Sequence, residues 1–146
     1  MKISARTRYG LRILLDIAAN ADDPSPRSIK TIAKSQGISA PFISRLAVPM
    51  KRKGLISSAR GVAGGLRLAK PADEISLLDI MTALDGPVSI LKCISQAKRC
   101  KRSGFCGVRS VWKELNDLIA DSLRSVTLAK VMERTDHENR KTGYCI

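Results

Sequence analysis

The change of hydrophobic period at Gly54 constrains the fold of this chain more than any other feature. Before Gly54 the apolar residues recur at helical spacing, whereas residues 55–60 and 66–69 alternate on either side of the glycine-rich segment 61–65. Alternating segments that flank a glycine-rich turn are typical of a β-hairpin. The sequence therefore predicts a helical region followed directly by a two-stranded ribbon.

The helical region before the hairpin contains two short helices joined by a tight turn. Ser28 can cap the first helix, in which Ile32 and Ala33 face inward, and Gly37 can adopt the left-handed conformation that ends a helix. Ile38 then returns to the core. This arrangement is typical of a helix-turn-helix. A helix pair in an unrelated all-α core could show the same short pattern, but the hairpin that follows favours a winged helix.

The second helix of the pair contains a proline. Ser39 can cap this helix, and Ile43, Leu46 and Met50 lie on its inward face. Pro49 removes one backbone hydrogen bond at a cost of about 3 kcal/mol. We therefore expect this helix to kink or to end a turn early.

More helices are predicted outside this region. Apolar residues at helical spacing predict a first helix over residues 3–20, and Ser76 with Asp79 forms the capping pattern of another. A long helix over residues 108–123 and a short one capped by Thr127 follow.

The chain therefore divides into four parts of a mainly α fold with one small β-hairpin wing. We assign residues 1–72 to a winged helix-turn-helix domain, 73–107 to a connecting helix and a cysteine loop, 108–135 to a dimerisation helix and a C-terminal helix, and 136–146 to a flexible tail. A length of 146 residues suits one compact domain with an appended element.

Positive charge is concentrated in the first half of the chain, whose formal net charge is +13 overall. Positions 1–70 hold fourteen Lys and Arg against three acidic residues, whereas positions 110–146 hold six against six. A positive field steers polyanions, so nucleic acid is the first partner to consider. Aromatic residues make up 3% of the chain, which favours duplex binding over stacking of single-stranded bases. A solvated basic surface is the alternative explanation for the charge alone.

The long helix carries a broad apolar stripe. Such a stripe can pack against the chain's own core or pair with a second copy. We favour pairing, because helix-turn-helix proteins usually read two half-sites as dimers. The expected interface residues are Val111, Trp112, Leu115, Leu118 and Ile119.

Three cysteines, Cys93, Cys100 and Cys106, lie in a segment rich in Gly, Ser, Lys and Arg. From Lys92 to Arg109 there are six basic residues and no acidic one. Positive charge favours thiolates, so the segment is a candidate for metal ligands or for a redox sensor.

Catalysis and membrane insertion are not indicated. The sequence shows no His partner for any Cys or Ser, and neither a P-loop nor a dinucleotide-binding glycine motif occurs. We interpret the single histidine, His137 near the C-terminus, as a solvated side chain. No apolar run reaches the roughly 18 residues of a membrane helix, and the start lacks the apolar region of a signal peptide. We therefore expect a cytoplasmic protein that is not an enzyme and does not bind membranes.

Motifs along nearly the whole chain carry a resemblance to a known family. They are Thr7-Arg8-Tyr9-Gly10-Leu11-Arg12, Ile32-Ala33 with Gly37-Ile38-Ser39, Lys53-Gly54-Leu55-Ile56, Arg60-Gly61 with Gly64-Gly65-Leu66-Arg67-Leu68, Ala83-Leu84-Asp85-Gly86-Pro87, Trp112-Lys113-Glu114-Leu115 and Thr127-Leu128-Ala129. Together with three cysteines after the wing, they resemble the bacterial winged-helix regulators of the IscR, NsrR and RirA type.

The resemblance implies a sequence-specific transcription regulator whose DNA affinity is controlled by an iron-sulfur cluster that senses iron, redox or nitric oxide status. It implies a [2Fe-2S] or [4Fe-4S] cluster on Cys93, Cys100 and Cys106, a homodimer built from the long helix, and a palindromic operator in double-stranded DNA.

Two arginines depart from the ligand pattern of such relatives. Arg109 stands where IscR-like relatives place a ligand His, and Arg8 where an NsrR-like relative can use Asp. Arginine cannot donate a lone pair, so the fourth ligand is unidentified. The candidates are a water, a small thiol, a carboxylate of the partner subunit, and Cys145, which we interpret as an unligated tail thiol. The first cysteine interval is also one residue longer than the commonest family spacing.

The helix-turn-helix and the wing define the expected DNA contacts. Ser39, Ser44 and Arg45 are expected at base edges in the major groove, and Arg60 in the adjacent minor groove. Lys51, Arg67 and groups of the first helix are expected to hold phosphates. The full expected set is Ser28, Ser39, Pro41, Phe42, Ser44, Arg45, Lys51, Ser58, Arg60, Gly61, Gly64, Arg67, Lys2 and Tyr9.

Two other functions stay open. The departures at Arg8 and Arg109 favour a winged-helix regulator that senses thiol oxidation, zinc or a partner protein without a cluster. An RNA- or ribosome-associated protein would explain the basic charge but neither the wing nor the cysteines.

Overall fold

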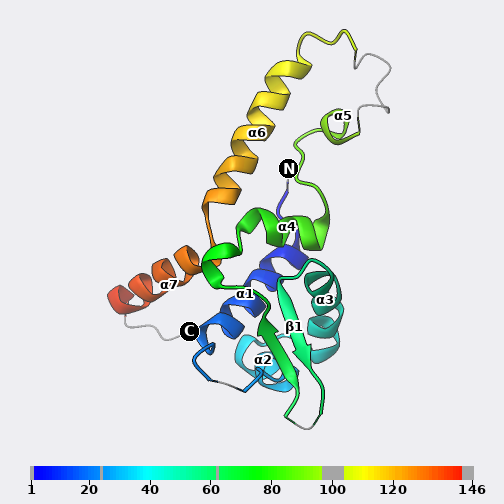
Figure 1. Cartoon of the computed structure of the whole chain (residues 1–146). Coiled ribbons are helices and arrows are strands. Elements are labelled where there is room, and N and C mark those ends of the chain that lie inside the picture. The colour runs from blue at the N-terminus through cyan, green and yellow to red at the C-terminus, as the bar shows by residue number, and fades with distance from the viewer. Residues whose placement is uncertain (1, 24, 62, 97–103, 143–146) are drawn as a thin grey trace.

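The computed structural model describes residues 2–23, 25–61, 63–96 and 104–142. It shows a helical body from which one long helix extends (Figure 1). The helices are α1 (Ala5–Ala19), α2 (Ile29–Gln36), α3 (Ala40–Arg52), α4 (Leu77–Asp85), α5 (Lys92–Ser95), α6 (Arg109–Ser125) and α7 (Leu128–Thr142), with a 3-10 turn η1 (Ala72–Glu74) and strands β1 (Ile56–Ala59) and β2 (Gly65–Leu68). A mainly helical fold with one antiparallel hairpin confirms the predicted class.

The turn between α2 and α3 has the predicted geometry. The Ser28 hydroxyl accepts a hydrogen bond from the Thr31 N–H at 3.1 Å and caps α2. Gly37 ends α2 with φ of 63°, the left-handed conformation that glycine adopts without strain. Ile32 and Ile38 are buried on either side of this turn. The helix-turn-helix is thus confirmed.

The early end of α3 and its cap by Ser39 are the two expectations that are wrong. The helix continues through Pro49 to Arg52. Leu46 and Met50, which flank Pro49, are both buried, so packing on the core offsets the lost backbone hydrogen bond. Ser39 occupies the N-cap position but makes no capping hydrogen bond.

The hairpin is held against the body by a third segment. In its register Ile56 pairs with Leu68 and Ser58 with Leu66. Arg27 also forms a bridge with Leu66, through backbone hydrogen bonds of 2.9 and 2.8 Å. A Cβ atom on Gly65 would lie 2.5 Å from the Arg27 carbonyl oxygen, so glycine is required for this close approach.

The core lies where α1, α3 and α4 meet under the base of the wing. Ile13, Leu14, Ile43 and Ile80 are fully buried there. The helix α4 begins with a capping box between Ser76 and Asp79, as predicted.

The last two helices are attached to the start of α4. A β-bridge joins Ser76 to Thr127, and α6 ends just before it. The Lys130 N–H lies 3.4 Å from the Thr127 hydroxyl, which confirms the predicted cap of α7. The helix α7 is longer than expected and takes in residues 136–142 of the segment assigned to the tail. No helix-breaking residue occurs in α7 before Gly143.

Among the described residues, no helix is both long and apolar enough to cross a membrane.

Candidate nucleic-acid interface and cysteine segment

A groove runs between the start of α2, the outer side of α3 and the wing. None of the residues that line it is acidic. Two lysines from different helices, Lys30 on α2 and Lys51 on α3, supply positive charge along it. The predicted contact residues that meet in this groove are Ser28, Ser44, Lys51, Ser58, Gly61 and Gly64.

The wing and α3 are linked across the groove. Lys51 Nζ lies 3.5 Å from the Ser58 hydroxyl on β1. Both side chains are exposed, so neither is withdrawn from a polyanion in the groove. Hydroxyls and ammonium groups side by side are the donors that bind phosphate oxygens.

Further predicted residues of α3 lie on its exposed side. Ser39, Pro41 and Arg45 are exposed. The Ser39 hydroxyl, which makes no capping bond, is free to donate to another acceptor. Phe42 is half-buried, and its ring packs edge to face with the Tyr9 ring on α1, with centroids 5.6 Å apart.

Arg60 is exposed next to Gly61, where the hairpin turns. Gly61 has φ of 103°, a conformation that side chains other than glycine rarely adopt. The sharp turn after Arg60 therefore depends on glycine.

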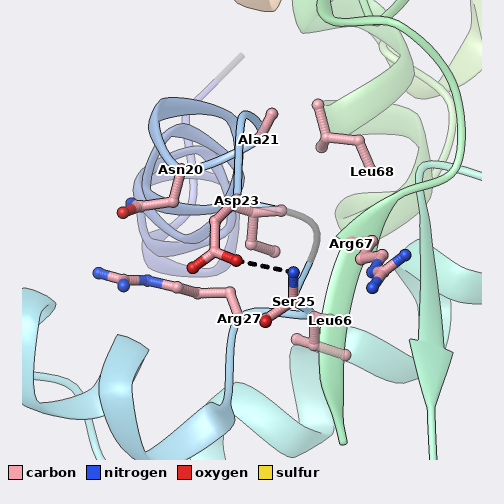
Figure 2. Close-up of a pocket in the computed structure, with 9 residues that line it drawn as sticks. Asn20, Ala21, Asp23, Ser25, Arg27, Leu66, Arg67 and Leu68 are labelled. Carbon is pink, nitrogen blue, oxygen red and sulfur yellow. Dashed lines mark hydrogen bonds between the residues drawn. The ribbon is translucent and has the colours of Figure 1, made fainter. Parts of the chain in front are cut away.

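Two of the predicted residues that lie outside the groove line other hollows. Arg67 lines a separate hollow with Asn20, Asp23 and Ser25 (Figure 2). Leu66, which precedes it in sequence, lines both the groove and this hollow, whereas Arg67 lines the hollow alone. Lys2 lines a small hollow formed with the end of α4.

The cysteine segment joins α4 to α6. Cys93 is half-buried on the short helix α5, and Cys106 is exposed just before α6; both carry free thiols. The placement of Cys93 in a helical turn differs from the expected continuous loop. Cys100 and Cys145 lie outside the described residues.

A hollow at the start of α6 is lined by Cys106, Arg109 and Lys113. The Nε atom of Arg109 is buried and has no hydrogen-bond partner within the described part of the chain. Within the described ranges, no three His, Cys, Asp or Glu side chains gather closely enough to hold a metal ion.

The apolar stripe of α6 is largely uncovered. Leu118 is 67% and Trp112 41% exposed, and Val111 and Leu115 are also exposed, whereas Ile119 is half-buried. A different face of α6 meets its own chain, where the buried Asn116 side chain accepts a hydrogen bond from the Ile90 N–H at 3.0 Å.

Comparison with known proteins identifies the family of this chain. The family Rrf2, described as "Iron-dependent Transcriptional regulator", matches residues 3–134. The chain belongs to the Rrf2 family. It is 36% identical over 132 residues to Protein rrf2 of Nitratidesulfovibrio vulgaris, covering 90% of this chain and 87% of that protein.

Solved Rrf2-type structures share the fold. The CymR structure titled as the global cysteine regulator of B. subtilis superposes with a TM-score of 0.73 at 30% identity and covers 92% of this chain and 98% of that chain. The T. potens IscR structure gives 0.71 at 30% identity, covering 92% and 88%. The Rrf2 chain is thus a DNA-binding transcriptional regulator, as the sequence predicted.

The structure adds residues that the sequence analysis of this Rrf2 protein missed. Lys30 lines the groove, and its position in the first turn after the Ser28 cap could have indicated this. Asp16 on α1, whose side chain is 4% exposed, accepts hydrogen bonds from Arg27 Nε at 2.8 Å, from Gln36 Nε2 at 2.9 Å and from the Ser35 hydroxyl. Burial would raise the pKa of the Asp16 carboxyl, but these hydrogen bonds and the charge of Arg27 hold it below its usual value.

Proposed function

We propose that this regulator binds a palindromic operator as a dimer and that an iron-sulfur cluster on Cys93, Cys100 and Cys106 controls its DNA affinity. The hollow at Cys106 is the observation that carries the proposal. It combines a free thiol with two cationic side chains, and the Nε atom of Arg109 has no hydrogen-bond partner among the described residues. Thiolates are the ligands of iron-sulfur clusters, and hydrogen bonds to sulfur tune them.

The family match and the donor chemistry both fit such a group. The family is described as iron-dependent, and thiolates are ligands of iron. Lys113 and Arg109 line the hollow with Cys106 and bring positive charge to it. A bound cluster would supply a group whose charge and integrity respond to iron, oxidants or nitric oxide. Arg109 would donate a hydrogen bond to sulfur and would not act as a ligand.

The surroundings of the cysteine segment support a link to DNA binding. The residues between α4 and Cys93 contact α6 through the Ile90–Asn116 hydrogen bond. We infer that α6 pairs with a second copy through its exposed stripe. Ordering the cysteines would then act on the spacing of the two recognition helices α3, which is the coupling that the proposal needs.

The DNA contacts that we propose are those of the groove and of exposed α3. Ser39, Ser44 and Arg45 would read bases, and Arg60 would enter the minor groove. Lys30 on α2 and Lys51 on α3 would hold phosphates, because each lines the groove with an exposed ammonium group.

A regulator that senses thiol chemistry without a cluster is the second candidate. The free thiols Cys93 and Cys106, the arginines at positions 8 and 109, and the likeness to a structure titled as a global cysteine regulator favour it.

Anaerobic purification decides between the two. We expect brown protein that contains iron and acid-labile sulfide. Replacement of Cys93, Cys100 or Cys106 with Ala should abolish the binding of iron and sulfide, whereas Cys145→Ala should not. Colourless protein without sulfide after reconstitution contradicts the cluster. Loss of sulfide in Cys145→Ala would instead make Cys145 the fourth ligand.

A titration then tests whether the cluster controls DNA binding. A duplex selected from a random library by the cluster-loaded protein is titrated with both forms at one salt concentration. A difference in affinity or in sequence preference is expected, and equal binding by both forms would show that the cluster is not the switch.

A further inference from the structure

The side chain of Arg45 rests on an aromatic ring. Its guanidinium carbon lies 5.6 Å from the centroid of the Phe42 ring, three residues earlier on α3. This distance is within the range of a cation–π interaction. Among the described residues, no ion pair involves Arg45. The ring of Phe42 is therefore the group that positions this exposed cation.

The ring of Phe42 is itself held in place. It meets Tyr9 of α1 edge to face, at an interplanar angle of 90°. Both rings are half-buried and pack on the hydrophobic core. Because an edge-to-face pair fixes both ring planes, the orientation of the face beneath Arg45 depends on α1 as well as on α3.

The Tyr9 ring is held in turn by a second arginine, Arg12. The Arg12 guanidinium carbon lies 5.7 Å from the centroid of the Tyr9 ring. Its Nη2 donates to the Gln36 carbonyl oxygen at 2.6 Å, and its Nε to Gln36 Oε1 at 3.2 Å. Gln36 in turn donates to the buried Asp16 carboxylate. This series, which we name the aromatic ladder, consists of Asp16, Gln36, Arg12, Tyr9, Phe42 and Arg45.

We propose that Phe42 and Tyr9 are positioning residues that hold the Arg45 guanidinium ready to read a guanine. The inference rests on the proposed placement of α3 in the major groove. A guanidinium that stacks on a ring keeps its N–H groups at its edge, where two of them can donate to the O6 and N7 atoms of guanine. A long side chain that is already oriented loses less conformational entropy when it binds.

This role differs from direct contact between the rings and DNA. A ring that touches a base or a thymine methyl would determine a base pair of its own. A positioning ring affects the base pair that Arg45 reads and has no effect once Arg45 is absent. The salt dependence of binding should not change in either case, because no phosphate contact is removed.

The test uses the full-length protein and a duplex that the parent protein selects from a random library. Arg45→Ala first identifies the guanine, as the position where base replacement no longer changes affinity. Phe42→Leu keeps an apolar side chain on the core but removes the ring. We expect it to weaken the preference for that guanine by about two- to five-fold, with an unchanged salt slope.

Conservative variants and a double mutant complete the design. Phe42→Tyr and Tyr9→Phe retain the rings and should retain the preference, whereas Tyr9→Leu should weaken it at the same base pair. In the Arg45→Ala background, Phe42→Leu should add nothing. Phe42→Met repeats the test if leucine lowers the melting temperature, since it also lacks the ring.

Three outcomes overturn the inference. An equal effect of Phe42→Leu with and without Arg45 shows that the ring does not act through it, and an effect at another base pair shows a direct contact. If Arg45→Ala keeps the full preference of the parent protein at every base pair, Arg45 does not read a base. Failure of the parent protein to select any duplex over random sequence is a separate result. It would contradict the proposed function of the groove, on which the inference rests.

Discussion

The Asp85 carboxylate, at the end of α4, accepts hydrogen bonds from two hydroxyls of the first turn of α1. Its Oδ2 lies 2.6 Å from the Ser4 Oγ and 2.7 Å from the Thr7 Oγ1. A carboxylate at a helix N-terminus also complements the helix dipole. Because residue 86 begins the segment that leads to Cys93, this contact ties the cysteine segment to the DNA-binding body.

Replacement of Asp85 with Ala should lower the free energy of unfolding by about 1–3 kcal/mol, because the part-buried Thr7 hydroxyl and the exposed Ser4 hydroxyl lose a charged acceptor. Urea denaturation measures this loss. Asp73→Ala, at an exposed position of η1 with no hydrogen bond in the described structure, is the matched control and should change stability by less than about 0.5 kcal/mol. Equal losses in the two variants would show that the Asp85 contact stabilises nothing.

Acid should weaken the protein through Asp16. The pKa of its carboxyl is lowered in the folded state, so its ionised form stabilises the fold above the unfolded pKa of about 3.9. This contribution is lost as the pH falls through the lower, folded pKa. Asp16→Asn should therefore cost roughly 1–3 kcal/mol at pH 7 and should flatten the loss of stability below pH 4.

Denaturation curves from pH 7 to pH 2.5 provide the measurement. The exposed Asp22→Asn is the control, and it should keep the parent's pH dependence. A parent-like slope in Asp16→Asn would contradict the assignment.

The groove lysines should contribute to DNA affinity without regard to sequence. Lys30→Ala and Lys51→Ala should each weaken binding to selected and random duplexes alike. Each should also reduce the salt slope, the dependence of log affinity on log salt concentration, by about one unit. Lys130→Ala, on α7 outside the groove lining, should leave the slope unchanged. Binding isotherms at several salt concentrations measure the slope for each variant. If Lys30→Ala keeps the parent slope, phosphate does not contact that side of the groove.

The exposed stripe of α6 should be the dimer interface. Leu118→Lys places a charge where a partner helix would pack, so the variant should sediment as a monomer at micromolar concentration. Asp117→Lys introduces the same side chain one residue earlier, where Lys113 Nζ lies 2.7 Å from the Asp117 carboxylate, and should stay dimeric because exposed pairs contribute little. A dimeric Leu118→Lys would place the interface elsewhere.

Much of the secondary structure and part of the candidate site could be predicted from the sequence. The Ser28 cap, the Gly37 turn, the hairpin and the Ser76–Asp79 capping box depend on residues a few positions apart. The same local signals overestimated how strongly Pro49 would shorten α3. The helix continues past Pro49, because the burial of Leu46 and Met50 offsets the lost hydrogen bond.

The tertiary structure decided which of these residues meet. Lys30 and Ser58 line one groove, whereas Arg67 on the same hairpin lines another hollow. The pairing of Tyr9 with Phe42 also joins helices whose residues are far apart in the chain. Local periodicity fixes the inward face of each element, but the neighbour that this face meets depends on how all the helices pack around one core.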